Sequence, residues 1–183
     1  MIKRAKISPC GRYRYWLSRT WDAAAAPMVF VMLNPNLADA TRDDPTIRRC
    51  IGFAQREGYG GIFVVNLFAL RSPKPKELRR AGDPVGPQNE RWRRRAIKMA
   101  KERRTMIVGA WGAGGGRPAK DFCEFAASSG LELMCLGRTK DGGPRHPLYL
   151  RRPTVRTIPL TGVASTGRME APQFAATPAI TEA

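Results

Sequence analysis

Residues 30–50 read FVMLNPNLADATRDDPTIRRC. The apolar run that enters this stretch begins at Met28 and is short and continuous, as in a strand covered on both faces. It ends at Asn34-Pro35 and gives way to a polar loop, after which Pro45 opens a helical pattern that reaches Gly58. Strands and helices that alternate in this way build sheets with helices on both faces. The stretch therefore predicts an α/β fold.

The same unit recurs along the chain. Apolar runs at residues 62–68, 106–111 and 131–137 are separated by two helical patterns, one opened by Pro87 and one preceded by WGAGGGRP. Right-handed crossovers make such strands parallel. We therefore predict a three-layer α/β/α sandwich around a central, mostly parallel four-stranded sheet. Residues 12–19, RYRYWLSR, alternate basic and apolar side chains and are predicted to form an edge strand.

The length of the chain predicts a single domain. Residues 1–160 of the 183 are expected to form one α/β domain, which is long enough to bury a core. Residues 161–183 are rich in Pro, Thr, Ala and Ser and show no sustained periodicity. This composition predicts a flexible C-terminal tail.

The charge of the chain indicates its partners. Lysine and arginine exceed the acidic residues by 17, and the pI is near 10.8. Such an excess favours polyanions, nucleic acid first and an anionic membrane surface second. The alternative is a basic protein that is merely soluble. We expect DNA as the partner and a monomeric protein.

Membrane, secretory and metal-binding classes lack support in the sequence. No apolar run approaches ~18 residues, and the N-terminal MIKRAKISPCGRYRYW has no apolar signal core, so we expect no membrane span and a cytoplasmic location. The four cysteines show no metal-ligand spacing, and the chain has one histidine. We therefore predict reduced thiols, no structural zinc or iron–sulfur site and no cofactor.

Polar residues stand where each predicted core strand ends. The first strand ends at Asn34, the second carries Asn66, the third leads to Trp111-Gly112 and the fourth leads to His146. In α/β sheets, ligands bind outside the carboxyl ends of the strands. The sequence therefore predicts that these residues surround one pocket.

Three strings carry a resemblance to a known family. LNPNLADATRDDPT, VVNLFALR and RHPLYL are similar to those of the bacterial family known as domain of unknown function 1643, and the likeness covers about residues 12–150. More distantly, the motif order resembles the uracil-DNA glycosylase superfamily. There, an Asn-Pro-like loop, an asparagine, a Trp-Gly loop and a His-Pro loop follow four successive strands. This resemblance implies a uracil-DNA glycosylase-like fold and hydrolysis of the N-glycosidic bond of a modified or damaged base.

The resemblance implies a role for each strand-end residue. A glycosylase turns a base out of the stack, reads its edge and stabilises the charge that the base acquires as the sugar bond breaks. Asn66 would read the base, His146 would donate a hydrogen bond to the departing base, and Asn34 would position the attacking water. Asn36 and Phe68 would complete the base pocket.

Structural alternatives stand beside these roles. Asn66 is equally typical of a buried amide that bridges two loops, and His146 of a surface histidine in a turn. The sequence also departs from the distant superfamily, because Asn36 stands where glycine is usual and Leu148 where a phosphate-binding serine is frequent.

The acidic block has three interpretations. Asp39, Asp43 and Asp44 follow the first strand. Asp39 is predicted to supply a catalytic carboxylate to the pocket. Alternatively, the three carboxylates hold Mg²⁺, a cation that prefers oxygen ligands. In the third interpretation Asp43 or Asp44 caps the helix and Asp39 shapes a turn.

A second set of residues is predicted to contact the nucleic-acid backbone. The glycine run precedes a helix, where free N–H groups favour phosphate, although a plain tight turn is as consistent with it. It lacks the Lys-Ser/Thr ending of an ATP-binding loop. Residues 91–104 hold eight basic residues and one acidic residue. This density of charge indicates either a surface that contacts phosphates or a solvated face of a helix. Leu150 is predicted to lie at the rim of the pocket, where its side chain would fill the space that the extruded base leaves in the stack. The predicted contacts are Gly112, Gly114, Arg138, Lys140, Arg145 and Leu150.

Three functions follow as hypotheses. The first is a glycosylase that acts on DNA. The second is a catalytically inactive member of the same fold that binds nucleic acid or a nucleotide. The third is an enzyme that acts on a free nucleoside or nucleotide.

Overall fold

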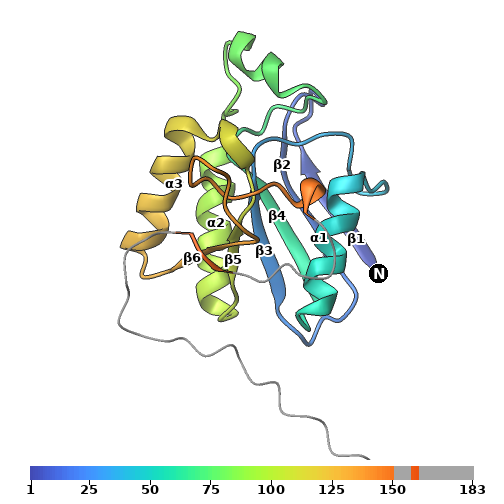
Figure 1. Cartoon of the computed structure of the whole chain (residues 1–183). Coiled ribbons are helices and arrows are strands. Elements are labelled where there is room, and N and C mark those ends of the chain that lie inside the picture. The colour runs from blue at the N-terminus through green and yellow to red at the C-terminus, as the bar shows by residue number, and fades with distance from the viewer. Residues whose placement is uncertain (151–157, 161–183) are drawn as a thin grey trace, which may run out of the picture.

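The computed structural model describes residues 1–150 and 158–160, which form a seven-stranded mixed sheet in the order β1-β2-β4-β3-β5-β6-β7 (Figure 1). Strands β4, β3, β5 and β6 are parallel to one another, whereas β1, β2 and β7 run antiparallel to their neighbours. The strands are β1 (Ile2–Ile7), β2 (Arg14–Thr20), β3 (Pro27–Met32), β4 (Gly61–Asn66), β5 (Ile107–Gly109), β6 (Leu133–Cys135) and β7 (Ile158–Pro159).

The α/β fold is confirmed, but the prediction of a four-stranded, mostly parallel sheet is wrong. The four parallel strands are the four apolar runs of the sequence, and three antiparallel strands extend them. Strand β1 has the sequence IKRAKI, whose alternating lysines and arginine protect a sheet edge instead of forming an apolar run. Strand β7 has only two residues. Strand β2 is not the predicted edge strand, because it pairs with β1 on one side and β4 on the other.

Three α-helices and three short 3₁₀ helices connect the strands. The predicted cap of the first helix is confirmed, since Asp44 Oδ1 accepts a hydrogen bond of 2.9 Å from the Ile47 N–H and Pro45 lies in the first turn. The helices are α1 (Pro45–Arg56), η1 (Pro75–Arg80), α2 (Asn89–Glu102), η2 (Gly112–Gly114), α3 (Gly116–Ser128) and η3 (Pro147–Tyr149).

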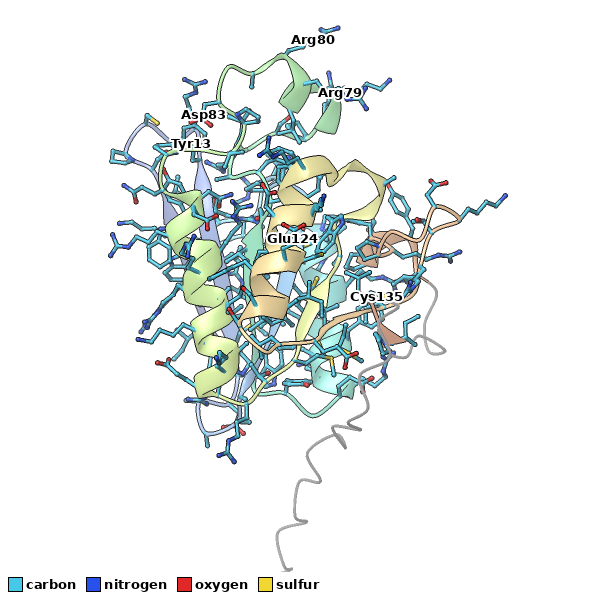
Figure 2. The ribbon with its side chains drawn as sticks, turned by 90° about the vertical axis from the view of Figure 1, so that its left-hand side faces the viewer. Tyr13, Arg79, Arg80, Asp83, Glu124 and Cys135 are labelled. Atoms are coloured by element: carbon cyan, nitrogen blue, oxygen red, sulfur yellow. The ribbon has the colours of Figure 1, made fainter. Side chains whose placement is uncertain are left out.

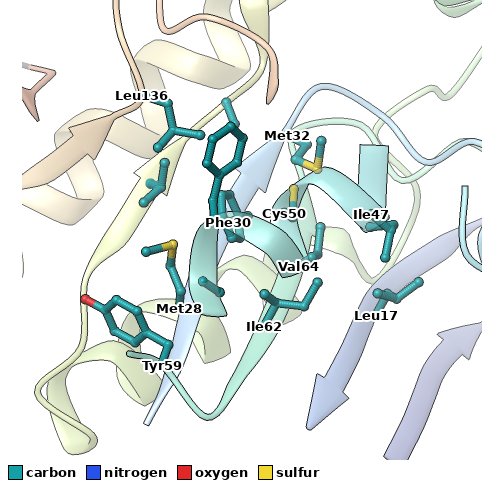
Figure 3. Close-up of a cluster of buried hydrophobic side chains, with 14 of the residues drawn as sticks. Leu17, Met28, Phe30, Met32, Ile47, Cys50, Tyr59, Ile62, Val64 and Leu136 are labelled. Atoms are coloured by element: carbon teal, nitrogen blue, oxygen red, sulfur yellow. The ribbon is translucent and has the colours of Figure 1, made fainter. Parts of the chain in front are cut away.

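Helices cover both faces of the sheet. On one face, α1 contributes Ile47 and Cys50 to a buried cluster with Phe30 of β3 (Figure 3). On the other face, α2 and α3 pack on a cluster that contains Val29 and Val31. Alternate residues of β3 thus point to opposite faces, as the two-residue period of a strand requires. Burial on both faces explains why β3 reads as a continuous apolar run.

The order of the parallel strands creates a crevice. Helix α1 follows β3 and leads outward to β4, whereas α3 follows β5 and leads in the opposite direction to β6. The loops that leave β3 and β5, which are neighbours in the sheet, therefore diverge to opposite faces. Ligands of open α/β sheets bind at such a switch point.

The described part of the chain ends at Leu160. This residue is buried in the cluster beneath α2 and α3, and its N–H donates a hydrogen bond of 2.7 Å to the Leu133 carbonyl. The tail predicted for residues 161–183 lies outside the described residues. Among the residues that the structure describes, no helix has the length and apolar character needed to cross a bilayer.

Candidate functional site

A cavity of about 490 Å³ lies at this switch point, and its lining combines apolar with polar side chains. Its walls come from the loop after β3, the start of α1, the segment around η1, the loop after β5 and helix η3. The volume is within the roughly 300–1,000 Å³ that is usual for small-molecule sites. The polar and charged side chains that line it are Arg14, Asn34, Asn36, Asp44, Thr46, Ser72, Arg79 and His146.

Asn34 lies in this cavity, where the sequence predicted it. Its Nδ2 donates hydrogen bonds of 2.8 Å to the Ser72 carbonyl and 3.1 Å to the Pro35 carbonyl. These bonds fasten the segment before η1 to the loop after β3. Among the described residues, no donor reaches the Asn34 Oδ1. The side chain therefore has its carbonyl oxygen available to a ligand or a water.

His146 lies in the same cavity, although 112 positions separate it from Asn34. The Gly112 N–H donates a hydrogen bond of 2.9 Å to the Pro144 carbonyl, which holds the loop before His146 against the loop after β5. His146 Nδ1 accepts from the Leu148 N–H at 3.3 Å, so the proton of the neutral ring is on Nε2. Burial lowers the His146 pKa, and the charge of Asp44 only partly opposes this. The imidazole is therefore a neutral Nε2–H donor at pH 7.

Asp44 is the carboxylate that lines the cavity. The residue is almost fully buried, and one of its oxygens caps α1. The sequence pattern identified Asp44 as a helix cap, and the fold places the same carboxylate beside the ligand space.

Asp39 does not line the cavity. Its Oδ1 accepts hydrogen bonds from the Thr41 N–H, the Thr41 hydroxyl and the Arg42 N–H, all within 2.9 Å, so it shapes a turn. The backbone donors lower its pKa to about 2. Asp43 forms ion pairs with Lys3 and Arg19. The third interpretation of the acidic block is therefore correct, and no cluster of His, Cys, Asp and Glu in the described chain is arranged to hold a metal ion.

Asn66 is close to the cavity but is covered by Arg14. The Asn66 side chain is fully buried, and its Oδ1 accepts a hydrogen bond of 3.3 Å from Arg14 Nη2. Arg14 lines the cavity, whereas Asn66 does not. Asn66, which was predicted to read a base, therefore contacts Arg14, and it is Arg14 that lines the cavity.

Two further predicted contacts pack against the hydrophobic clusters instead of lining the cavity. Phe68 packs against the cluster under α2 and α3, outside the cavity lining. Leu150 is 6% exposed and belongs to the cluster under α1, so its predicted place at the rim is wrong. The apolar residues that line the cavity from η3 are Leu148 and Tyr149, and both are exposed. Asn36 is exposed and lines the cavity as predicted.

The glycine run has backbone and packing reasons of its own. Gly112 and Gly116 have φ of 70° and 52°, in the left-handed region that favours glycine. A Cβ on Gly115 would lie 2.6 Å from the Ala119 Cβ. The tight-turn interpretation is therefore sufficient, while Gly112 and Gly114 also line the cavity and α3 begins directly behind them.

Basic segments adjoin, in the sequence, two of the segments that line the cavity. Arg138, Lys140 and Arg145 are exposed on the loop that precedes His146, outside the cavity lining. The second segment, residues 71–83, carries five basic and two acidic residues. Figure 2 shows Arg79 and Arg80 of this segment on a projection beyond the body of the molecule, and Arg79 lines the cavity.

Sequence reasoning missed Arg14, Ser72 and Arg79 as site residues. Arg14 was hidden in a stretch whose alternating pattern suggested an exposed edge strand, although it is 2% exposed. Ser72 and Arg79 belong to a polar segment without hydrophobic periodicity. Such a segment gives no indication of the part of the fold against which it lies. The proximity of RSPKPKELRR to the strand end at Asn66 was the available signal.

The fold and the cavity define an α/β protein with a cavity, lined in part by polar side chains, at the carboxyl edge of its parallel strands. Residues 14–148 match the family described as Protein of unknown function (DUF1643), and the chain belongs to this family. The family resemblance found in the sequence is thereby confirmed. Comparison with curated proteins and with solved structures gave no match.

Proposed function

We propose that this protein acts on nucleic acid as a base-excising enzyme of the uracil-DNA glycosylase type, with its active site in the cavity at the switch point. The observation that carries the proposal is the meeting of Asn34, Asp44 and His146 in that one cavity. Together they offer a carbonyl oxygen, a carboxylate and a neutral N–H donor. The distant motif resemblance supplies the reaction class.

The proposed reaction breaks the bond between C1′ of the sugar and the base nitrogen, and the bonding electrons leave with the base. His146 Nε2–H donates to the base and stabilises the developing negative charge. Water adds to the cation-like C1′, positioned by Asn34 Oδ1. Asp44 takes the proton of this water, a role for which a carboxylate is better suited than an amide. The products are the free base and an abasic sugar.

The two basic segments support a nucleic-acid substrate. Residues 71–83 and the loop with Arg138, Lys140 and Arg145 carry exposed basic side chains, which would neutralise the phosphates of a strand whose base enters the cavity. Phosphate contacts position a nucleic acid without reading its sequence. Base selection would then depend on the cavity itself.

The test is incubation of the purified protein with single- and double-stranded oligonucleotides that carry different modified bases, followed by mass spectrometry of the products. Abasic sites and free base are the expected result for at least one base. The matched control is the Asn34→Ala protein, for which abasic sites should be lost while oligonucleotide binding persists. If no oligonucleotide in a broad set of bases yields abasic sites, the enzymatic proposal fails.

A second candidate is a catalytically inactive member of the fold that binds nucleic acid or a nucleotide. The burial of Asn66 behind Arg14 favours it, because the amide that would read a base is not free to do so. Binding without any excision in the same assay would identify this function.

A further inference from the structure

Two arginines of β2 are buried, and the fold treats them differently. Arg19 is 0% exposed, and its Nε forms an ion pair of 2.6 Å with Asp43. Arg19 also donates to four backbone carbonyls. Its charge and its N–H groups are thus satisfied within the protein.

Arg14 is compensated less completely, because burial lowers its pKa to about 10 and the charge of Asp44 opposes this only in part. It is 2% exposed, donates to the Ala38 carbonyl at 2.8 Å and the Asn66 Oδ1 at 3.3 Å, and makes no ion pair with a described carboxylate. Its Nε is buried without a hydrogen-bond partner among the described residues. A guanidinium has five N–H donors, and two hydrogen bonds leave three of them unused. A buried charge without a partner is strongly unfavourable, so its retention calls for a compensating group.

The surroundings of Arg14 indicate an anion as that group. Arg14 lines the cavity together with Arg79, while the one carboxylate of the lining, Asp44, already caps α1. Arg79 makes no ion pair within the described chain. The start of α3, the positive end of its helix dipole, lies behind Gly112 and Gly114 on the same wall. The positive groups of the cavity therefore exceed the negative ones.

We infer that Arg14 forms an anion subsite in the lining of the cavity and that this subsite holds a phosphate group of a nucleotide. This inference deepens the proposed function, on which it rests for the nucleoside part of the ligand. A planar guanidinium presents paired N–H donors that match phosphate oxygens. The phosphate belongs either to a free nucleotide or to a nucleic-acid strand, and both present the same oxygens to Arg14.

The experiment measures how far each ligand raises the melting temperature of the full-length protein at constant ionic strength. The ligands are inorganic phosphate, a nucleoside, its 5′-monophosphate and a short single-stranded oligonucleotide. At a concentration about 100 times its Kd, the monophosphate should raise the melting temperature by roughly 5–10 °C. The nucleoside should raise it much less. Stabilisation by the oligonucleotide but not the monophosphate would assign the subsite to a backbone phosphate.

Arg14→Gln is the decisive variant, with Lys6→Gln on β1 and Lys120→Gln on α3 as exposed controls outside the cavity lining. Each ligand-induced shift is taken relative to the variant's own melting temperature. Arg14→Gln should weaken phosphate-ligand binding about ten- to a hundredfold, the scale of losing charge-assisted hydrogen bonds, while both controls keep the wild-type shift. Equal shifts in Arg14→Gln and wild type would overturn the inference, as would equal stabilisation by nucleoside and monophosphate.

A second measurement observes ligand binding in the wild-type protein and uses a variant, the conservative Arg14→Lys, only for assignment. In the wild-type protein labelled with ¹⁵N-arginine, the Arg14 Nε–H resonance, assigned with Arg14→Lys, should move on addition of inorganic phosphate. An unmoved resonance at saturation with the monophosphate would contradict the subsite. Both measurements report binding alone, so a protein that binds phosphate but excises no base would refute only the proposed reaction.

Discussion

At the scale of single residues, His146 is the side chain whose chemistry the structure defines most closely. Its ring is fixed by the Leu148 N–H at Nδ1 and by the contact with Tyr149, whose ring centroid is 5.7 Å away. Burial keeps the ring neutral by lowering its pKa. A fixed neutral donor needs no reorganisation as charge develops on a ligand, which is what makes such donors effective.

We therefore predict that His146→Ala lowers the single-turnover rate of base excision by roughly 10²–10³-fold, the scale of losing one preorganised donor. Affinity for the oligonucleotide should change little, because phosphate contacts dominate it. The measurement is single-turnover kinetics alongside a binding titration of the same variant. Tyr149→Phe, which keeps the ring beside His146, serves as the control. An unchanged rate would remove His146 from the mechanism and leave the cavity as a binding site.

At the scale of the elements, the ion pairs of Asp43 join the antiparallel edge of the sheet to the loop before α1. Asp43 contacts Lys3 of β1 and Arg19 of β2, each at 2.6 Å. The Arg19 side chain is fully buried, whereas the Lys3 side chain is 34% exposed. This pairing positions the loop that ends at Asp44, so the edge strands contribute indirectly to the cavity wall.

Removal of Asp43 should therefore cost far more than removal of Lys3. Asp43→Ala leaves the buried Arg19 charge without its partner, and we expect a loss of about 3–5 kcal/mol in the free energy of unfolding. Lys3→Ala removes a half-exposed partner and should cost about 0–1 kcal/mol. Urea denaturation of both variants measures the difference. Equal losses would show that Arg19 is satisfied by its backbone carbonyls alone.

The same pairs predict a pH dependence. Burial by itself would raise the Asp43 pKa, but the hydrogen bonds from Lys3 and Arg19 outweigh it and lower the pKa below the usual 3.8. A depressed pKa in the folded state contributes stability above the unfolded value, and this contribution is lost as the pH falls. Urea denaturation of wild type should thus show stability falling below about pH 4. The fall should be shallower in Asp43→Asn, and an equally steep fall there would assign the effect to other carboxylates.

At the scale of the whole molecule, the net charge of +17 is the dominant property. Much of it is carried by surface segments, including α2 and the two basic segments next to the cavity lining in the sequence. On α2, Trp92 packs against Trp16 at 5.8 Å, and Arg93 and Ile97 are buried. The exposed side of the helix carries the basic residues Arg91, Arg94, Arg95, Lys98 and Lys101. Both the helix and the two basic segments are thus available to a polyanion.

We predict that affinity for DNA falls steeply as salt rises from ~50 to ~200 mM, because each neutralised phosphate releases counterions. If the strand passes over the cavity mouth, Arg80→Gln should reduce the slope of log K against log salt by about 1. Lys120→Gln on α3 should leave the slope unchanged. Fluorescence anisotropy with a labelled oligonucleotide gives both slopes. A flat salt response in wild type would rule out phosphate-dominated binding.

The family assignment, the four parallel strands and the cap of α1 all followed from the sequence by itself. Each depends on local pattern: apolar runs long enough to be strands, proline at a helix start and an aspartate before it. The placement of Asn34 and His146 at one edge followed as well, since parallel strands with crossover helices put their carboxyl ends together.

Only the tertiary structure decided which side chains form the cavity. Arg14 and Asn66 are 52 positions apart, and their hydrogen bond depends on β2 lying beside β4, a pairing that no local pattern encodes. Asp39 and Asp44 belong to the same loop, but Asp39 closes a turn with Thr41 and Arg42, whereas Asp44 caps the start of α1 and lines the cavity. The orientation of side chains within a loop and the pairing of strands across a sheet depend on long-range packing. For this reason the sequence did not predict that Arg14, the buried cation without an ion pair to a described carboxylate, lines the cavity.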